Sequence, residues 1–112
     1  MYKYNKNLLI IGSNHIDFLF DIRDVIKYED YYIVLLDIPA DKKDLNNIYC
    51  LDKNGKTVWQ VEDINKIYPR RNNLPYEQMG IKDGVIYASD FYGRNYSIDF
   101  KTGKIGGYRI MK

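Results

Sequence analysis

The order of apolar and polar positions along the chain is typical of β-strands. Residues 31–37 form a nearly continuous apolar and aromatic run, which indicates a strand covered on both faces. In residues 15–22 apolar and polar positions alternate, which predicts an amphipathic strand with Asp17 and Asp21 on its polar side. The short apolar run at residues 8–11 predicts a partner strand. We therefore predict an N-terminal strand pair ahead of a larger sheet.

One succession of strands and turns occurs twice, over residues 30–61 and again over residues 80–110. A repeat of about fifty residues built from short strands is typical of stacked β-meanders. Asn54-Gly55 forms the turn of the first copy, and we expect a tight primed hairpin there, because both residues tolerate positive φ. Lys101-Thr102-Gly103 takes this place in the second copy. With no sustained helical periodicity, the pattern predicts a mainly β chain of eight or nine antiparallel strands.

Polar connections separate the predicted strands. Pro39 begins a charged connection, since proline cannot donate to a strand ladder. Residues 63–78 read as a long loop, with one helical turn expected within residues 62–67. Loops longer than about twelve residues in compact domains are often functional. The length of 112 residues predicts a single domain over residues 1–112.

The repeat resembles the blade of quinoprotein-type β-propellers, in which an aromatic residue, a short apolar stretch and Asp precede a turn, Gly-Lys and Trp. The motif is carried by Tyr49-Cys50-Leu51-Asp52, Gly55-Lys56 and Trp59, and by Tyr96-Ser97-Ile98-Asp99 and Gly103-Lys104. The first copy is one turn residue short, and Gly107 stands in place of Trp in the second. The resemblance implies that the Asp accepts backbone N–H groups, that the Gly adopts a left-handed conformation and that Trp59 caps the core.

The number of copies limits what the resemblance implies. A closed propeller has at least four blades, and this chain holds two copies. Quinone binding in that family requires the full ring, so we expect no cofactor here. We expect the two meanders to cover each other as a sandwich or an open roll, or to assemble through oligomerisation.

Composition agrees with a folded β-protein. Hydrophobic residues make up 46% of the chain, and twelve tyrosines suit half-buried sheet surfaces. The N-terminal apolar stretch is shorter than a signal peptide or a membrane span requires. Together with the single Cys50, this predicts a cytoplasmic protein.

The net charge of +2 hides an asymmetry along the chain. Residues 15–45 hold eight acidic and four basic residues, a balance of −4, whereas residues 65–112 hold nine basic and four acidic residues, a balance of +5. Such separation can produce faces of opposite sign that steer partners, although ordinary solvated strand faces would give the same pattern. Our candidate partner-binding residues lie in the acidic part: Asp17, Asp21, Asp24, Tyr28, Glu29, Asp30 and Tyr31.

Candidate catalytic groups are isolated in the sequence. His15 could pair with Asp17, but no third group or nucleophile accompanies them. Cys50 has no recognisable histidine partner and reads as a small core residue. The sequence contains no His/Cys cluster with the spacing of a zinc site, no complete calcium-binding loop and no Gly-rich phosphate-binding loop. We therefore predict a protein that is not an enzyme and holds no metal.

These observations favour a non-enzymatic protein that binds another protein. The chain is similar in general build to small bacterial immunity proteins, which implies neutralisation of a toxin nuclease by carboxylates that pair with its basic active site. The alternative is a nucleic-acid-binding β-domain that uses the basic, tyrosine-rich C-terminal half. Its residues are Tyr68, Arg70, Arg71, Tyr76, Lys82, Tyr87, Tyr92, Arg94, Tyr96, Lys101, Lys104, Tyr108 and Arg109.

Overall fold

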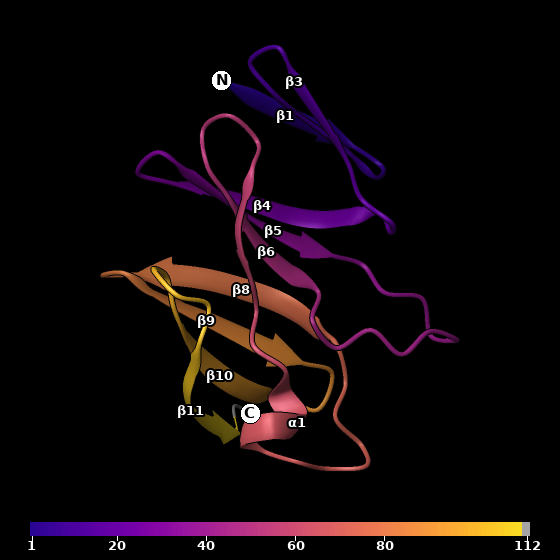
Figure 1. The fold of residues 1–112 in the computed structure, drawn as a ribbon. Coiled ribbons are helices and arrows are strands. Elements are labelled where there is room, and N and C mark those ends of the chain that lie inside the picture. Colours follow the sequence, from indigo (N-terminus) through magenta and orange to yellow (C-terminus); the bar gives the residue numbers. More distant parts are fainter. Residues whose placement is uncertain (111–112) are drawn as a thin grey trace.

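A computed structural model describes residues 1–110, the last three of them by their backbone only (Figure 1). These residues form three antiparallel sheets stacked as three layers. The first sheet contains β1 (Tyr2–Asn5), β2 (Leu8–Ile11) and β3 (Asn14–Asp17). The second contains β4 (Ile22–Tyr28), β5 (Tyr31–Leu36), β6 (Ile48–Leu51) and β7 (Thr57–Gln60). After α1 (Ile64–Ile67), the third contains β8 (Tyr76–Lys82), β9 (Val85–Asp90), β10 (Arg94–Asp99) and β11 (Ile105–Ile110).

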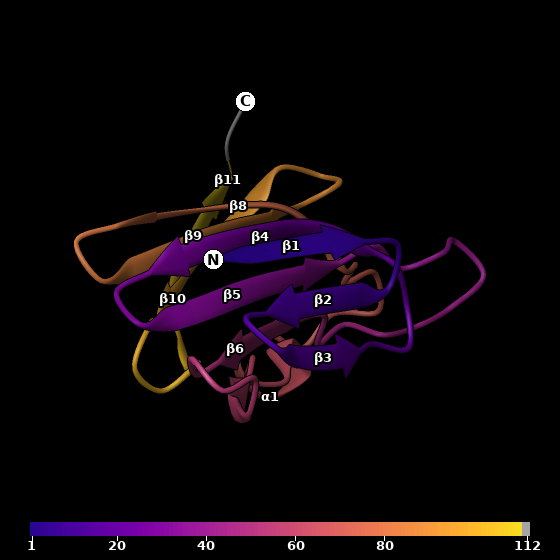
Figure 2. The same ribbon diagram turned by 90° about the horizontal axis from the view of Figure 1, so that it is seen from above.

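The predicted fold class is confirmed. The second and third sheets are four-stranded meanders in which each strand pairs with the next along the chain. They pack face to face, and none of the three sheets closes into a barrel. Figure 2 shows the first sheet lying over the second. The resemblance of the repeat to a propeller blade stays a prediction.

β5 is covered on both faces, as its apolar run predicts. Ile33 and Leu35 pack into the core shared with the third sheet. Tyr32 and Val34 point the other way, into the core shared with the first sheet. Because successive side chains of a strand alternate between faces, one strand supplies both cores.

The core between the second and third sheets is rich in aromatic rings. The Trp59 Nε1–H donates to the Phe100 carbonyl at 2.8 Å, so the indole is buried with its polar atom satisfied. The rings of Tyr28 and Tyr31 lie edge-on to Phe100, with centroids 4.8 and 5.4 Å away. Trp59 therefore caps this core as predicted.

Three turns share one construction, in which an Asp carboxylate accepts the N–H two residues later and a Gly with positive φ closes the turn. The pairs are Asp52 with Gly55, Asp90 with Gly93, and Asp99 with Gly103. The prediction of a primed turn at Asn54-Gly55 was wrong. Of these two residues only Gly55 has a positive φ, 84°, because the Asp52 carboxylate accepts both the Asn54 and Lys56 N–H groups and holds a longer turn.

The prediction of one continuous strand over residues 15–22 is also wrong, because β3 ends at Asp17 and β4 begins at Ile22. The chain crosses here from the first sheet to the second. On the way its backbone bonds to Lys6 and Asn7 of the β1–β2 turn and to Asp37, which directly follows β5. The N-terminal pair is a three-stranded sheet, because the polar segment of β1 pairs with β2.

The two meanders begin earlier than the repeat indicated. β4 opens the second sheet and β8 opens the third, so the eight or nine predicted strands become eleven within residues 1–110. β8 also shortens the predicted loop over residues 63–78. The helical turn expected within residues 62–67 is confirmed as α1, where the Asp63 carboxylate accepts the Asn65 N–H.

Candidate functional site

The structure spreads the predicted acidic residues along the molecule. Asp17 ends β3 and Asp21 lies between β3 and β4, whereas Glu29 and Asp30 form the turn at the far end of β4. Asp21 and Glu29 are separated by roughly 25 Å of extended chain. Asp24 is half-buried, and its carboxylate accepts the Val25 N–H. These carboxylates do not share one strand face.

Asp17 and Asp21 bracket an exposed apolar side chain. We call residues 17–21 the acidic loop. Leu19 at its centre is 84% exposed, and both aspartates beside it are exposed. Phe18 and Phe20 instead pack against the core between the first two sheets. The loop thus presents Leu19 outward between two carboxylates.

Four hydrogen bonds fix the backbone of the acidic loop. The Phe18 N–H donates to the Asn7 carbonyl at 2.9 Å, and the Asn7 side-chain amide donates back to the Phe18 carbonyl at 2.9 Å. The Ile22 N–H donates to the Lys6 carbonyl at 2.7 Å. The Asp21 carbonyl accepts the Asp37 N–H at 2.7 Å. The loop is therefore held in place before any partner arrives.

The nearest basic residue in sequence is already engaged. Arg23 donates to the Asp37 carboxylate at 2.9 Å and lies 3.9 Å from the Glu77 carboxylate. Among the described side chains no cation lies within ion-pair distance of Asp17 or Asp21. Their charges remain available to a partner.

Part of the basic, tyrosine-rich set is buried, whereas Arg71, Lys82, Tyr87, Tyr92, Lys101 and Lys104 are exposed. Tyr76 and Tyr96 are buried, and the Arg70 guanidinium donates to the Tyr96 hydroxyl at 3.0 Å. Arg94 is buried in an ion pair with Asp90 at 2.7 Å. The predicted residues Tyr108 and Arg109 lie outside the described side chains.

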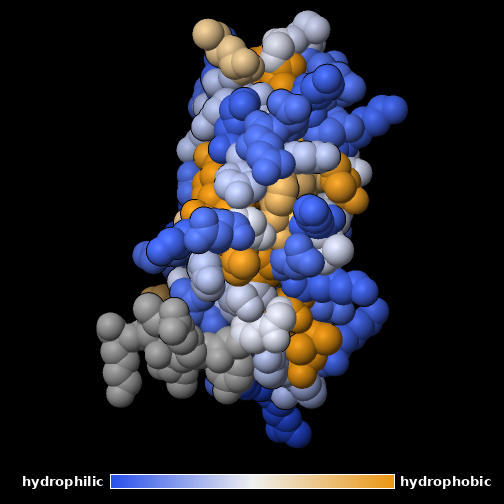
Figure 3. All heavy atoms as spheres, turned by 90° about the vertical axis from the view of Figure 1, so that its left-hand side faces the viewer, coloured by the Kyte–Doolittle hydropathy of each residue, from blue (hydrophilic) through white to orange (hydrophobic). Residues whose placement is uncertain are grey.

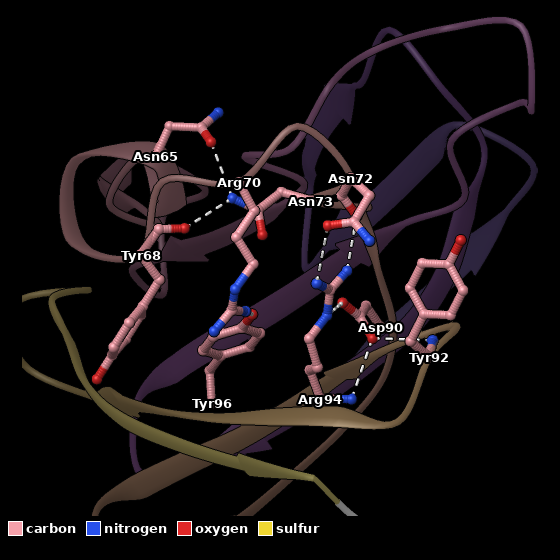
Figure 4. Close-up of polar contacts among 9 residues, drawn as sticks. All are labelled: Asn65, Tyr68, Arg70, Asn72, Asn73, Asp90, Tyr92, Arg94 and Tyr96. Atoms are coloured by element: carbon pink, nitrogen blue, oxygen red, sulfur yellow. Dashed lines mark hydrogen bonds and ion pairs between the residues drawn. The ribbon is translucent and has the colours of Figure 1, made fainter.

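These buried groups instead fasten the connection before β8 to the third sheet (Figure 4). Arg94 donates to the Asn72 carbonyl at 2.7 Å and to its side-chain oxygen at 3.3 Å. The Asn73 amide donates to Asn65 and to the Tyr68 carbonyl at 2.8 and 2.9 Å. The conformation of this connection is set by side chains of β9, β10 and α1.

A second candidate site lies where this connection meets the connection between β5 and β6. It is a groove of about 420 Å³, which we call the cationic groove. Its charged lining residues are Lys42, Lys43, Arg70 and Arg71, and no described carboxylate lines it. Sequence reasoning missed this groove because the lysines belong to the acidic part of the chain. The signal that could have located the groove is the presence of two basic pairs, Lys42-Lys43 and Arg70-Arg71, in two long connections.

The candidate catalytic residues stay apart. His15 is exposed in the first sheet, opposite Ile10. Cys50 is buried on the side of the second sheet that faces the third. Burial, with a smaller contribution from Asp52, raises the pKa of the Cys50 thiol to about 11, so a reactive thiolate is disfavoured.

Burial likewise raises the pKa of Tyr76, helped by neighbouring Tyr96 and Asp90. Within the described residues there is no cluster of three metal-ligating side chains. The same part of the chain contains no helix with the length and apolar character needed to cross a membrane.

Comparison with known proteins gives a family and a fold. Residues 1–108 match the family described as a domain of unknown function (DUF7957). No curated protein matches the sequence. The fold is similar to that of the computationally designed Ika8 protein, with a TM-score of 0.61 and 6% identity. That match covers 96% of this chain and 35% of the designed protein, so this chain spans about a third of its length.

Proposed function

This chain belongs to the DUF7957 family, and we propose from its own geometry that it is a non-enzymatic protein that binds a basic protein partner. We propose that the partner is the nuclease domain of a bacterial toxin. The chain would then be a cytoplasmic immunity protein that occludes the nuclease active site. The observation that carries the proposal is Leu19, 84% exposed between two exposed aspartates on a fixed loop.

The chemistry of a nuclease suits such a loop. Nuclease active sites are basic because they bind phosphates. Carboxylates that approach such a site accelerate association and select the partner, while an apolar anchor in a pocket supplies binding energy. A loop already held by four hydrogen bonds loses little further conformational freedom on binding.

The other predicted partner-binding residues extend this proposal along β4. Asp24, Glu29 and Asp30 could contact a partner that covers the whole strand. Tyr28 and Tyr31 are half-buried against Phe100 and would offer only their remaining exposed edges.

The experiment is co-expression with the product of the neighbouring gene, scored by co-purification and by rescue of growth. Leu19→Asp should abolish both if the acidic loop is the anchor. Ile67→Asp is the matched control, because Ile67 is an exposed apolar residue of α1, outside the acidic loop and β4. Equal binding by wild type and Leu19→Asp would contradict this assignment.

A further inference from the structure

We propose that the cationic groove, together with the neighbouring aromatic side chains Phe91 and Tyr92, binds a short stretch of single-stranded nucleic acid. The groove shares no residue with the acidic loop, so this inference is independent of the toxin partner.

Three of the four charged side chains that line the groove have no carboxylate partner within the described residues. Lys42, Lys43 and Arg71 are exposed, and no described carboxylate lies within ion-pair distance of them. Asp41 and Asp44 flank the lysines in sequence, but neither lines the groove. The Asp44 carboxylate accepts the Asn46 N–H at 3.0 Å instead. The groove therefore offers a run of positive charge to a polyanion.

The groove continues toward an exposed aromatic side chain. A second hollow of about 290 Å³ adjoins it and shares the lining residues Ala40, Lys42, Leu74 and Pro75. Phe91 also lines this second hollow and is 73% exposed. The Asp37 and Glu77 carboxylates line it too, and Arg23 lies 2.9 and 3.9 Å from them. A ligand laid along both hollows would meet lysine and arginine in the first, and the Phe91 ring beside carboxylates already paired with Arg23 in the second.

The aromatic pair is fixed relative to the groove. Tyr92 is 55% exposed, and its ring centroid lies 6.0 Å from that of Phe91. The Arg94 guanidinium lies 5.0 Å from the Tyr92 ring centroid. The same guanidinium donates to Asn72, a lining residue of the groove (Figure 4). Arg94 thus holds the aromatic turn and the groove wall in one arrangement.

Single-stranded nucleic acid fits this combination better than an acidic peptide does. Its phosphates pair with cations along a groove, and its unpaired bases stack on exposed aromatic rings. Asn65 and Asn72 also line the groove, and because their side-chain oxygens accept from Asn73 and Arg94, their NH2 groups can donate to base edges or sugars. An acidic peptide would use the cations and leave the aromatic pair without a role.

The test is fluorescence anisotropy of a labelled ten-nucleotide oligothymidylate, titrated with the full chain at several salt concentrations. Two groove variants carry Lys42→Glu with Lys43→Glu, or Arg71→Glu. A third carries Phe91→Ala with Tyr92→Ala. The matched control is Lys53→Glu with Lys56→Glu, which changes the net charge as much as the double lysine variant does, at the exposed β6–β7 turn. Circular dichroism melting confirms that each variant is folded.

We expect the groove variants to weaken binding and to reduce the slope of log K against log salt by about 0.7 for each phosphate that the protein no longer neutralises. The aromatic variant should weaken binding roughly five- to a hundredfold with the slope unchanged, since stacking is not ionic. The control should change affinity by less than about twofold, because its lysines lie outside the groove. The proposal is overturned if control and groove variants weaken binding equally, if a glutamate peptide of equal charge binds as tightly, or if the oligonucleotide does not bind.

Discussion

The indole of Trp59 lies directly on Gly103, so close that a Cβ atom on Gly103 would come within 2.5 Å of Trp59 Cε3. Trp59 belongs to β7 of the second sheet, and Gly103 belongs to the β10–β11 turn of the third. The Gly103 carbonyl also accepts the Glu62 N–H at 3.0 Å. The two meanders are therefore joined at a position that only glycine can occupy.

Gly103→Ala should destabilise the protein by about 2–4 kcal/mol, because it adds a clash to an unfavourable left-handed φ of 75°. Gly84→Ala is the matched control, since Gly84 has a φ of 78° and a Cβ atom there would meet no other atom within 4 Å. Urea unfolding of both variants separates the clash from the backbone effect. Equal losses would show that the contact with Trp59 is not tight.

Trp59→Ala should lower the free energy of unfolding by roughly 3–5 kcal/mol, because it leaves a large cavity and an unpaired Phe100 carbonyl. The measurement is again urea unfolding. A negligible loss would mean that the ring is not part of the core.

Arg94→Met should cost about 3–5 kcal/mol, because it leaves the Asp90 carboxylate buried without its cation. The side chains of Asp90 and Arg94 are only 1% and 8% exposed. Arg23→Met breaks the exposed pair with Asp37 and should cost no more than about 1 kcal/mol. Similar losses in thermal unfolding for both variants would contradict the difference in burial.

Stability should fall as the pH rises above about 9. The folded state raises the pKa of Cys50 from 9.0 to about 11 and also raises that of Tyr76. Between the unfolded and folded pKa values the unfolded chain binds fewer protons, so the free energy of unfolding decreases with pH.

Tyr76→Phe isolates one part of this pH dependence. Its hydroxyl is buried without a hydrogen-bond partner among the described residues, so its removal should be neutral or slightly stabilising at pH 7. Above pH 10 the variant should lose stability less steeply than wild type in chemical unfolding. An unchanged alkaline slope would exclude Tyr76 as a source.

Asp17→Lys and Asp21→Lys should each slow association with a basic partner and weaken its salt dependence, with stability changed by less than about 0.5 kcal/mol. Asp41→Lys provides the control, as it reverses an exposed carboxylate outside the acidic loop. Stopped-flow or surface-binding kinetics measure the rates. Equal slowing by all three would indicate a diffuse field rather than a local contact.

Local sequence patterns predicted much of the fold. The apolar run of β5 and the helical turn after Asp63 follow from rules that act within a few residues, whereas the capping position of Trp59 was implied by the resemblance to a propeller blade. The turn at Asp90 repeats the Asp52 spacing with Gly93 and could have been recognised in the same way.

Other features depend on packing between distant segments. β3 ends at Asp17 because its partner strand β2 begins at Leu8, and the next N–H, that of Phe18, bonds to Asn7 in the β1–β2 turn, which alternation alone does not reveal. The cationic groove combines residues about thirty positions apart, held by a connection whose shape depends on Arg94. Figure 3 shows polar side chains interrupted by separate apolar patches, a distribution that charge counts along the sequence do not convey.

Each strand in the three sheets pairs only with strands adjacent to it in the chain. Short loop closures of this kind carry a small entropic penalty and favour rapid folding for a β-protein. A nascent chain leaving the ribosome could therefore complete each hairpin before the following one is synthesised. Contacts such as the Asn47 amide with the Tyr76 carbonyl would then lock successive units together last.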